Sequence, residues 1–164
     1  MISTDQIAAP SGAAAFNVQG STIHNLLGVR VNNPEKDMTE TTKSRLLDQL
    51  ERLLVLIIDE RSMISSKVLA AAERNTRECI YRGQNSSEIW GGLPVVLLFG
   101  DDYQLMPVDK NGAINGYDKR CCGADQYVTD KMSKAQLFAY QGDRLFTDIM
   151  TDQVFFLTKN FRVQ

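Results

Sequence analysis

The sequence predicts a three-layer α/β domain with a parallel sheet, and two observations carry this prediction. Continuous aliphatic runs at 54–60 and 93–101 end in acidic residues, as strands buried on both faces of a parallel sheet do. Apolar residues recur with helical spacing over 44–54 and 65–82. Strand and helix therefore alternate, which is typical of βαβ units with right-handed crossovers.

Shorter patterns complete the expected order of elements. Residues 153–158 form a further aliphatic and aromatic run that predicts a strand, and residues 6–10 fit the end of another. Apolar periodicity over 134–150 predicts a last helix before the final strand. Residues 109–134 are polar, contain several glycines and are too long for a simple connection. We interpret them as an inserted flexible loop within one domain that spans residues 1–164.

Composition limits the classes of protein to which the chain can belong. With 164 residues, 43% of them hydrophobic, it can bury a core, and its longest apolar runs are far shorter than the ~20 residues of a membrane-spanning helix. A net charge of −2 argues against binding nucleic acid by bulk charge alone but leaves a groove binder open. Residues 1–9 contain no Lys or Arg, so we expect any targeting segment to be absent or to lie outside this chain. The cysteines lack CxxC spacing, which suggests neither a disulfide framework nor a zinc site.

An acidic pair, Asp59-Glu60, follows the first aliphatic run, at the end of the strand where open α/β folds bind their ligands. In nucleotide hydrolases such an Asp holds Mg²⁺, usually through water, and the Glu polarises the attacking water. The alternative is that the pair only caps the following helix, together with Ser62 or Ser65. The pattern favours nucleotide chemistry and leaves the capping interpretation open.

Two further polar residues follow the other aliphatic runs. Gln104 comes shortly after the run at 93–101, and its amide could contact both a phosphate oxygen and an attacking water. Arg162 follows the run at 153–158 and could reach a γ-phosphate to stabilise developing charge. Each also has a plainer interpretation, as a solvated loop residue and as a surface arginine. Only together with the acidic pair do they indicate a nucleotide site.

Small and hydroxylated residues stand at the end of the segment 6–10 and just after it. Pro10, Ser11 and Gly12 lie there, and Thr22 and His24 come soon after. Such residues let a backbone approach a phosphodiester closely, and His24 could stack on a nucleotide or form a hydrogen bond with it. A lone histidine is more often structural, so spacing alone favours a structural role for His24.

Four segments, taken in order, resemble the Pif (petite integration frequency) DNA helicases, superfamily-one motors that unwind DNA in the 5′ to 3′ direction. The segments are APSGAAAFNVQGSTIH, LLVLIIDERSM, GGLPVVLLFGDDYQLMPV and LTKNFR. Their order and spacing agree with the family over nearly the whole chain. The resemblance implies a RecA-like P-loop NTPase fold and ATP-dependent DNA helicase activity, and by family a part in DNA repair, recombination and telomere maintenance.

The resemblance also implies roles for individual residues. Asp59 and Glu60 would be the Walker B pair, with Asp59 on Mg²⁺ and Glu60 catalytic. Gln104 would be the phosphate sensor and Arg162 the arginine of the fourth motif, both in contact with ATP. The track for single-stranded DNA would be lined by Pro10, Ser11, Gly12, Thr22 and His24. The implied partners are ATP, single-stranded DNA and a second RecA-like lobe, with no membrane, in the nucleus or mitochondrion of a eukaryote or otherwise in the cytoplasm.

The chain departs from the family in one important respect, because no GxxxxGK[ST] occurs in it. In the family this phosphate-binding loop and its strand come just before the APSG segment, so we expect a partial first motor domain that lacks them. Without the loop the chain should not hydrolyse ATP. The alternative is a non-catalytic, truncated helicase copy, as from a mobile element, that keeps weak binding of single-stranded DNA. A smaller departure is Arg61, which stands where the family commonly has an aliphatic residue.

Overall fold

The computed structural model describes residues 4–80, 88–101, 104–105, 133–150 and 153–157. Within them, one parallel sheet has the strand order β2-β1-β3-β4. The strands are β1 (Asp5–Ala9), β2 (Ser21–Thr22), β3 (Val55–Ile58) and β4 (Val95–Leu98). The predicted parallel α/β fold is confirmed, and the strands expected at 6–10, 54–60 and 93–101 correspond to β1, β3 and β4.

Helices connect these strands, and several of them begin after a hydroxyl residue that accepts a backbone N–H. The capped helices are α1 (Gly12–Asn17) after Ser11, α2 (Ile23–Leu26) after Thr22, α3 (Glu40–Leu50) after Thr39 and α4 (Ser66–Cys79) after Ser65. Two 3₁₀ turns, η1 (Arg61–Met63) and η2 (Ile89–Gly92), precede α4 and β4, and α6 (Lys134–Met150) follows β4 in the chain. No helix of the described residues is long and apolar enough to cross a membrane.

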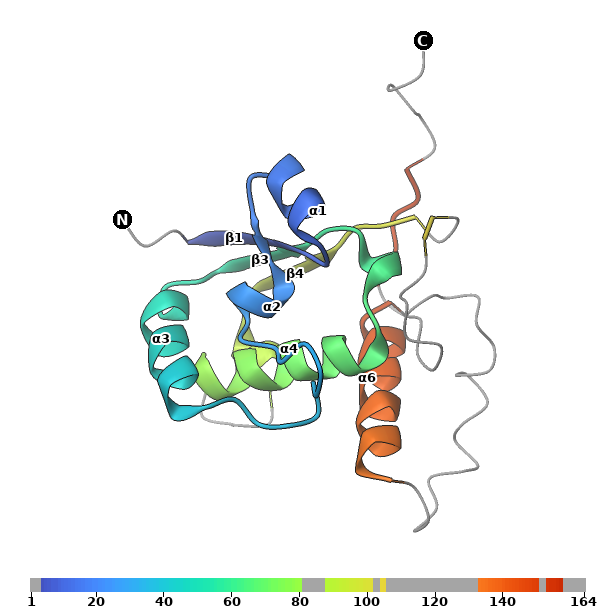
Figure 1. The fold of residues 1–164 in the computed structure, drawn as a ribbon. Coiled ribbons are helices and arrows are strands. Elements are labelled where there is room, and N and C mark those ends of the chain that lie inside the picture. Colours follow the sequence, from blue (N-terminus) through green and yellow to red (C-terminus); the bar gives the residue numbers. More distant parts are fainter. Residues whose placement is uncertain (1–3, 81–87, 102–103, 106–132, 151–152, 158–164) are drawn as a thin grey trace.

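The helices cover the two faces of the sheet unequally. Figure 1 shows α3 and α4 below the sheet and α1 above it. Leu56 and Ile58 of β3 belong to the core and are 0% exposed. Val95 and Leu97 of β4 keep 39% and 41% exposure, because α1 packs on β1 and β2, at the other side of the sheet from β4. The expectation of strands buried on both faces therefore holds for one face of the described sheet only.

The prediction of a strand at 153–158 is wrong for residues 153–157, the part that the structure describes. Residues 153–157 have no regular secondary structure, and Phe155, Phe156 and Leu157 are each at least 80% exposed. None of the described residues pairs with the free side of β4. A strand needs a neighbour for its backbone N–H and C=O groups, so apolar content alone does not produce one. Most of the loop expected at 109–134, together with residue 158, lies outside the described residues.

α6 crosses the start of α4 at close range. A Cβ atom built on Gly142 would lie 1.9 Å from the carbonyl oxygen of Ser66, so this approach requires a glycine. Beside it the Ser66 hydroxyl donates to the carboxylate of Asp143, and Phe146 of the same helix is buried in the core. α6 is thereby fixed against the first turn of α4.

The substitution Gly142→Ala should lower the free energy of unfolding by about 1–3 kcal/mol, because its methyl group would overlap a helix carbonyl that cannot move alone. Gly12→Ala is the matched control, since nothing lies within 4 Å of a Cβ at Gly12 in α1. Urea denaturation of both variants and the parent chain measures the effect. Equal loss of stability in the two variants would contradict the described packing of α6.

Candidate functional site

The parallel register brings the carboxyl ends of the strands into line. Ile58 of β3 pairs with Ala8 of β1 and with Leu98 of β4, and Ala9 pairs with Thr22 of β2. Neighbouring strands in a sheet lie about 4.8 Å apart. The residues that follow these strands therefore lie side by side along one edge of the sheet, the edge at which open α/β folds bind their ligands.

Asp59 and Glu60 leave β3 in the middle of this edge. The amide of Asp59 donates to the carbonyl of Ala8 at 2.9 Å and so extends the β1–β3 ladder past the strand. Neither carboxylate forms a hydrogen bond or an ion pair with the described residues, and both side chains are partly exposed. Glu60 precedes η1 without capping it, and the cap of α4 is Ser65. The following helix is thus capped by Ser65, one of the two serines that the capping interpretation named, but the acidic pair takes no part in the cap. Both carboxylates remain open to a ligand.

The backbone at Glu60 is strained. Its φ of 51° and ψ of 46° are left-handed, which costs a residue with a side chain about 1–2 kcal/mol. The turn directs the amide of Arg61 to the carbonyl of Phe99 at 2.8 Å. Gly100 fits closely beside it, because a Cβ there would lie 2.9 Å from the Arg61 nitrogen. Strain held in place by such neighbours is concentrated at functional sites.

Arg61 fixes the acidic turn to the rest of the domain. Its side chain is buried at 9% exposure, and its guanidinium lies 5.2 Å from the centre of the Phe146 ring on α6. An arginine over an aromatic face is held by the charge distribution of the ring. In the sequence, Arg61 stands out only as a departure from the family. Its burial could not be predicted, because a charged residue directly after two acidic residues is usually exposed.

Gln104 lies on the β4 side of the same edge. The amide of Phe99 donates to the carbonyl of Ile58 at 2.8 Å and holds the end of β4 against β3. Beyond it, the amide of Gln104 donates to the carbonyl of Asp101 at 3.1 Å, and the Gln104 side chain is exposed. Gln104 therefore follows the strand next to the one that carries the acidic pair. The described structure shows no contact between the Gln104 side chain and either carboxylate. Arg162 lies outside the described residues.

The predicted DNA-track residues occupy the β1–β2 side. The Ser11 hydroxyl accepts the amide of Ala14 at 3.2 Å, and the Thr22 hydroxyl accepts the amide of Asn25 at 3.3 Å. Each hydroxyl caps a helix with its oxygen and keeps its own hydrogen for another acceptor. Gly12 is exposed with open space above its Cα.

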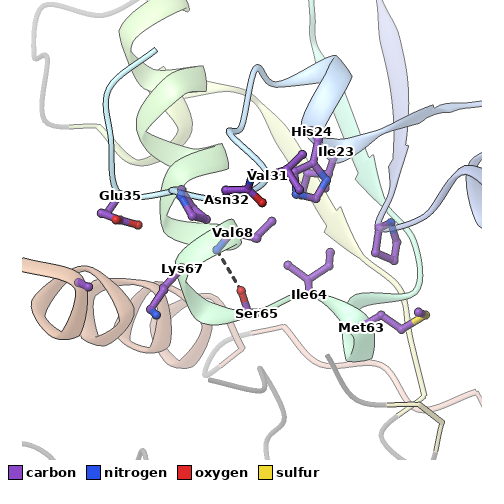
Figure 2. Close-up of a pocket in the computed structure, with 13 residues that line it drawn as sticks. Ile23, His24, Val31, Asn32, Glu35, Met63, Ile64, Ser65, Lys67 and Val68 are labelled. Atoms are coloured by element: carbon purple, nitrogen blue, oxygen red, sulfur yellow. Dashed lines mark hydrogen bonds between the residues drawn. The ribbon is translucent and has the colours of Figure 1, made fainter. Parts of the chain in front are cut away.

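His24 and Pro10 line a cavity of about 340 Å³ between α2, the loop that follows it and the start of α4. Figure 2 shows His24 on the wall opposite Ile64 and Val68. Burial lowers the pKa of His24, so its ring is neutral at pH 7, and it forms no hydrogen bond with the described residues. The structure therefore offers no hydrogen-bonding role for His24 within the fold and leaves its ring free to stack on a ligand.

The other titratable groups limit the chemistry of the site. Among the described residues no group of three or more His, Cys, Asp or Glu side chains could hold a metal ion. Mg²⁺ at nucleotide sites needs one or two carboxylates and takes its other ligands from water and phosphates, so the open carboxylate of Asp59 fits this ion. Burial raises the pKa of the free Cys79 thiol to about 11, which keeps it protonated and unreactive.

A parallel α/β sheet with an acidic pair at the end of a central strand is the arrangement of the RecA-like fold class. The chain belongs to the PIF1-like helicase family, whose model matches residues 3–124.

Individual relatives agree with this assignment. The chain is 32% identical over 154 residues to an ATP-dependent DNA helicase Pif1 of Bdellovibrio bacteriovorus, an alignment that covers 89% of this chain and 32% of the relative. Among solved structures it is similar to Bacteroides Pif1, unliganded and bound to single-stranded DNA, with 34% and 35% identity and a TM-score of 0.50 for both. Those alignments cover 67% and 65% of this chain and 25% and 24% of the Bacteroides chains. The chain thus spans about a third or less of the length of these relatives.

The left-handed backbone at Glu60 predicts how substitutions there change the stability of the protein. Glu60→Gly should raise the free energy of unfolding by up to about 1 kcal/mol, because glycine adopts this backbone without steric cost. Glu60→Gln, which keeps the side-chain size and the strain, should leave stability unchanged. Thermal or urea unfolding of both variants tests this. A Glu60→Gly variant that is less stable than Glu60→Gln would contradict the described backbone conformation.

Proposed function

We propose that this chain is part of the first motor domain of an ATP-dependent DNA helicase. The observation that carries the proposal is the arrangement along one sheet edge, with an open acidic pair in the middle, Gln104 on one side and the small and hydroxylated residues on the other. The paired strands connect the two candidate sites within one sheet. The name of the Bdellovibrio relative, an ATP-dependent DNA helicase, supports the same activity.

The nucleotide half of the proposal assigns roles to four residues. Asp59 would hold Mg²⁺, which neutralises the phosphate charge that develops during hydrolysis. Glu60, whose side chain is partly exposed and uncapped, would orient and deprotonate the attacking water. Gln104 would contact the γ-phosphate and the same water through its amide. Arg162, outside the described residues, would stabilise the charge on the γ-phosphate.

The DNA half places a single strand over the β1–β2 side of the edge. The hydroxyl hydrogens of Ser11 and Thr22 would donate to phosphates, the open space above Gly12 would admit the backbone, and His24 and Pro10 would contact bases. The Bacteroides relative solved with single-stranded DNA supports this partner. Binding of this kind is nearly independent of sequence and is weakened by salt.

Finer statements are proposals by family alone. They are unwinding in the 5′ to 3′ direction, a second RecA-like lobe that closes over the edge, a part in repair, recombination and telomere maintenance, and a place in the nucleus, the mitochondrion or the cytoplasm. The competing proposal is a non-catalytic protein that only binds single-stranded DNA, and the observation in its favour is that the Ser11 and Thr22 hydroxyls each keep a hydrogen for a phosphate.

The catalytic roles can be tested in a chimera in which this chain replaces the matching segment of the Bdellovibrio relative. Glu60→Gln should reduce the DNA-stimulated ATPase rate by about 10²–10⁴-fold while nucleotide binding persists, because only the general base is lost. Arg162→Ala should reduce it by up to about 10³–10⁵-fold, because charge on the γ-phosphate is no longer stabilised. Phosphate release and a nucleotide titration measure the two quantities.

The controls for this experiment compare the ATPase activity of the chimera with that of the 164-residue chain alone. The unsubstituted chimera must hydrolyse ATP, and the 164-residue chain alone should give no rate above background because it contains no phosphate-binding loop. If either variant chimera hydrolyses ATP at the rate of the unsubstituted chimera, the role assigned to that residue is wrong. If the 164-residue chain alone hydrolyses ATP, and Glu60→Gln abolishes this activity, another segment of the chain binds the phosphates.

The DNA track can be tested with a substitution that keeps the helix cap. Ser11→Asp retains a good N-cap but adds a negative charge beside the phosphates, and unit charges about 4 Å apart repel by about 1 kcal/mol in water. We expect binding of a labelled oligothymidylate to weaken about fivefold by fluorescence anisotropy. Thr39→Asp is the matched control, because Thr39 caps α3 in the same way on a different part of the molecule. Equal binding by the two variants would move the track away from α1.

A further inference from the structure

The cavity beside His24 is lined mainly by three parts of the chain, and Pro10 after β1 and Ala135 of α6 add one residue each. One wall comes from α2 with His24 and Ile23, a second from the loop after α2 with Asn32, and the floor from Ile64 and the first turn of α4. Figure 2 shows these side chains around a common space, with Met63 at one end and Lys67 and Glu35 at the other. The cavity adjoins the proposed DNA track, because Pro10 lines it too.

The lining has the character of a site for a flat, partly polar ring. Ile23 and Ile64 lie beneath the cavity with almost no exposed surface of their own, while His24, Asn32 and Ser65 add polar groups at its wall. A volume of about 340 Å³ falls in the range of small-molecule sites, about 300–1,000 Å³. Histidine is one of the side chains on which unstacked bases stack in single-stranded nucleic acids.

The charged side chains that line the cavity lie at the end away from Met63 (Figure 2). Lys67, in the first turn of α4, and Glu35, in the loop, both line that end. A phosphate next to an inserted base would be attracted by the ammonium group of Lys67 and repelled by the carboxylate of Glu35. The phosphate is therefore expected on the α4 side of the cavity, at Lys67.

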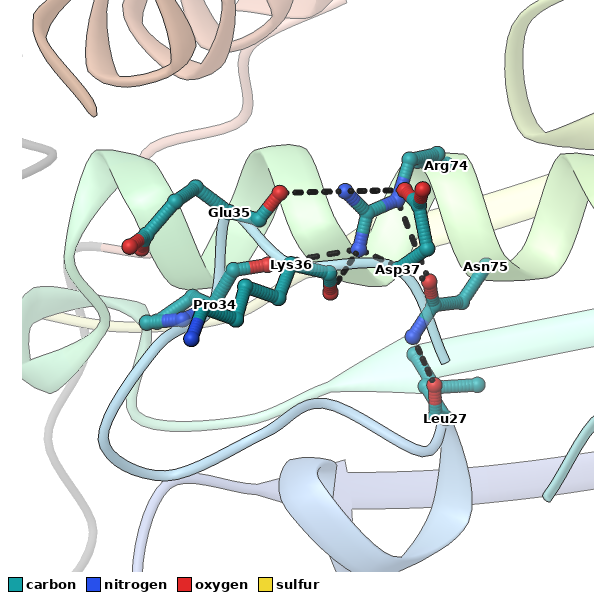
Figure 3. A network of polar contacts seen from close by, with 7 residues as sticks. All are labelled: Leu27, Pro34, Glu35, Lys36, Asp37, Arg74 and Asn75. Carbon is teal, nitrogen blue, oxygen red and sulfur yellow. Dashed lines mark hydrogen bonds and ion pairs between the residues drawn. The ribbon is translucent and has the colours of Figure 1, made fainter. Parts of the chain in front are cut away.

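The loop wall is held in place without a ligand. The guanidinium of Arg74 on α4 donates to the backbone carbonyls of Pro34, Glu35 and Lys36 at 3.3, 3.0 and 2.9 Å, as Figure 3 shows. It also lies 3.3 Å from a carboxylate oxygen of Asp37.

A second contact from α4 fixes the other end of the loop. The buried side-chain amide of Asn75 donates to the carbonyl of Leu27, just after α2, at 2.9 Å. Two neighbouring residues of one helix therefore hold both ends of the loop, and the cavity is formed before anything enters it. Preformed sites lose less entropy on binding.

We propose that this cavity receives one unstacked base of the single-stranded DNA, stacked on His24, with the adjoining phosphate at Lys67. The inference rests on the proposed function, since it needs the strand to run past Pro10 and Ser11. It adds a base-accepting pocket and a phosphate contact on α4 to the track. Arg74 is a positioning residue for this pocket, because it touches the wall and not the nucleotide.

The test compares two strands on the 164-residue chain, a labelled oligothymidylate and an abasic strand of the same length. If a base enters the pocket, the parent chain binds the oligothymidylate at least about fivefold more tightly. His24→Leu should abolish this preference, because leucine keeps side-chain bulk in the cavity but has no aromatic ring. His24→Phe should restore the preference, which a merely structural role for His24 does not predict.

The phosphate contact is tested by charge reversal. Lys67→Glu should weaken binding of both strands and reduce the salt dependence by about one phosphate contact. Lys36→Glu is the matched control, because Lys36 is exposed on the loop, does not line the cavity and contacts Arg74 only through its carbonyl. Equal effects of the two reversals would overturn the assignment of Lys67.

The outcomes separate the pocket from the proposed function. A parent chain that binds both strands equally, or a His24→Leu variant that keeps the preference for bases, overturns the pocket while DNA binding stands. A parent chain that binds neither strand overturns the DNA-binding part of the proposed function itself.

Discussion

The pairing register of β1, β3 and β4 is the constraint on which the candidate site depends. In a parallel sheet a shift of one residue would turn each side chain to the opposite face and move each strand end along the edge. The observed register ends β1 and β3 together, and the ladder continues for one residue through the amide of Asp59. Because the ladder fixes this residue, the next one takes up the sharp turn. The strained turn at Glu60 thus begins one residue after the ladder ends.

Much of this arrangement could be predicted from the sequence. The aliphatic runs located β1, β3 and β4, and helical periodicity located α4 and α6 within a few residues of their bounds. The run at 153–158 misled for a physical reason, because a strand also requires a partner, and periodicity says nothing about partners. The acidic pair was placed correctly at a strand end, and the finding that both carboxylates are open needed the structure.

The contacts that the sequence could not supply are those of buried or half-buried arginines. Arg61 packs on the Phe146 ring, and Arg74 lies 5.0 Å from the centre of the Phe138 ring, so both connect the α4 region to α6. Each arginine stands in a segment that reads as a solvated helix face or turn, and each ring is far along the chain. No local pattern links them. Through these contacts and the Gly142 crossing, α6 supports both the acidic turn and the loop beside the cavity.

The way in which Arg74 holds its loop bears on how freely the sequence there can change. Most of its bonds to the loop end on main-chain carbonyls, which every amino acid provides. The one ion pair with a loop side chain involves Asp37, whose carboxylate is 87% exposed, and exposed pairs contribute little. The path of the loop is therefore nearly independent of the side chains it carries. During evolution, relatives could replace those side chains and alter which ligands the cavity accepts, without a change in the backbone path of the loop.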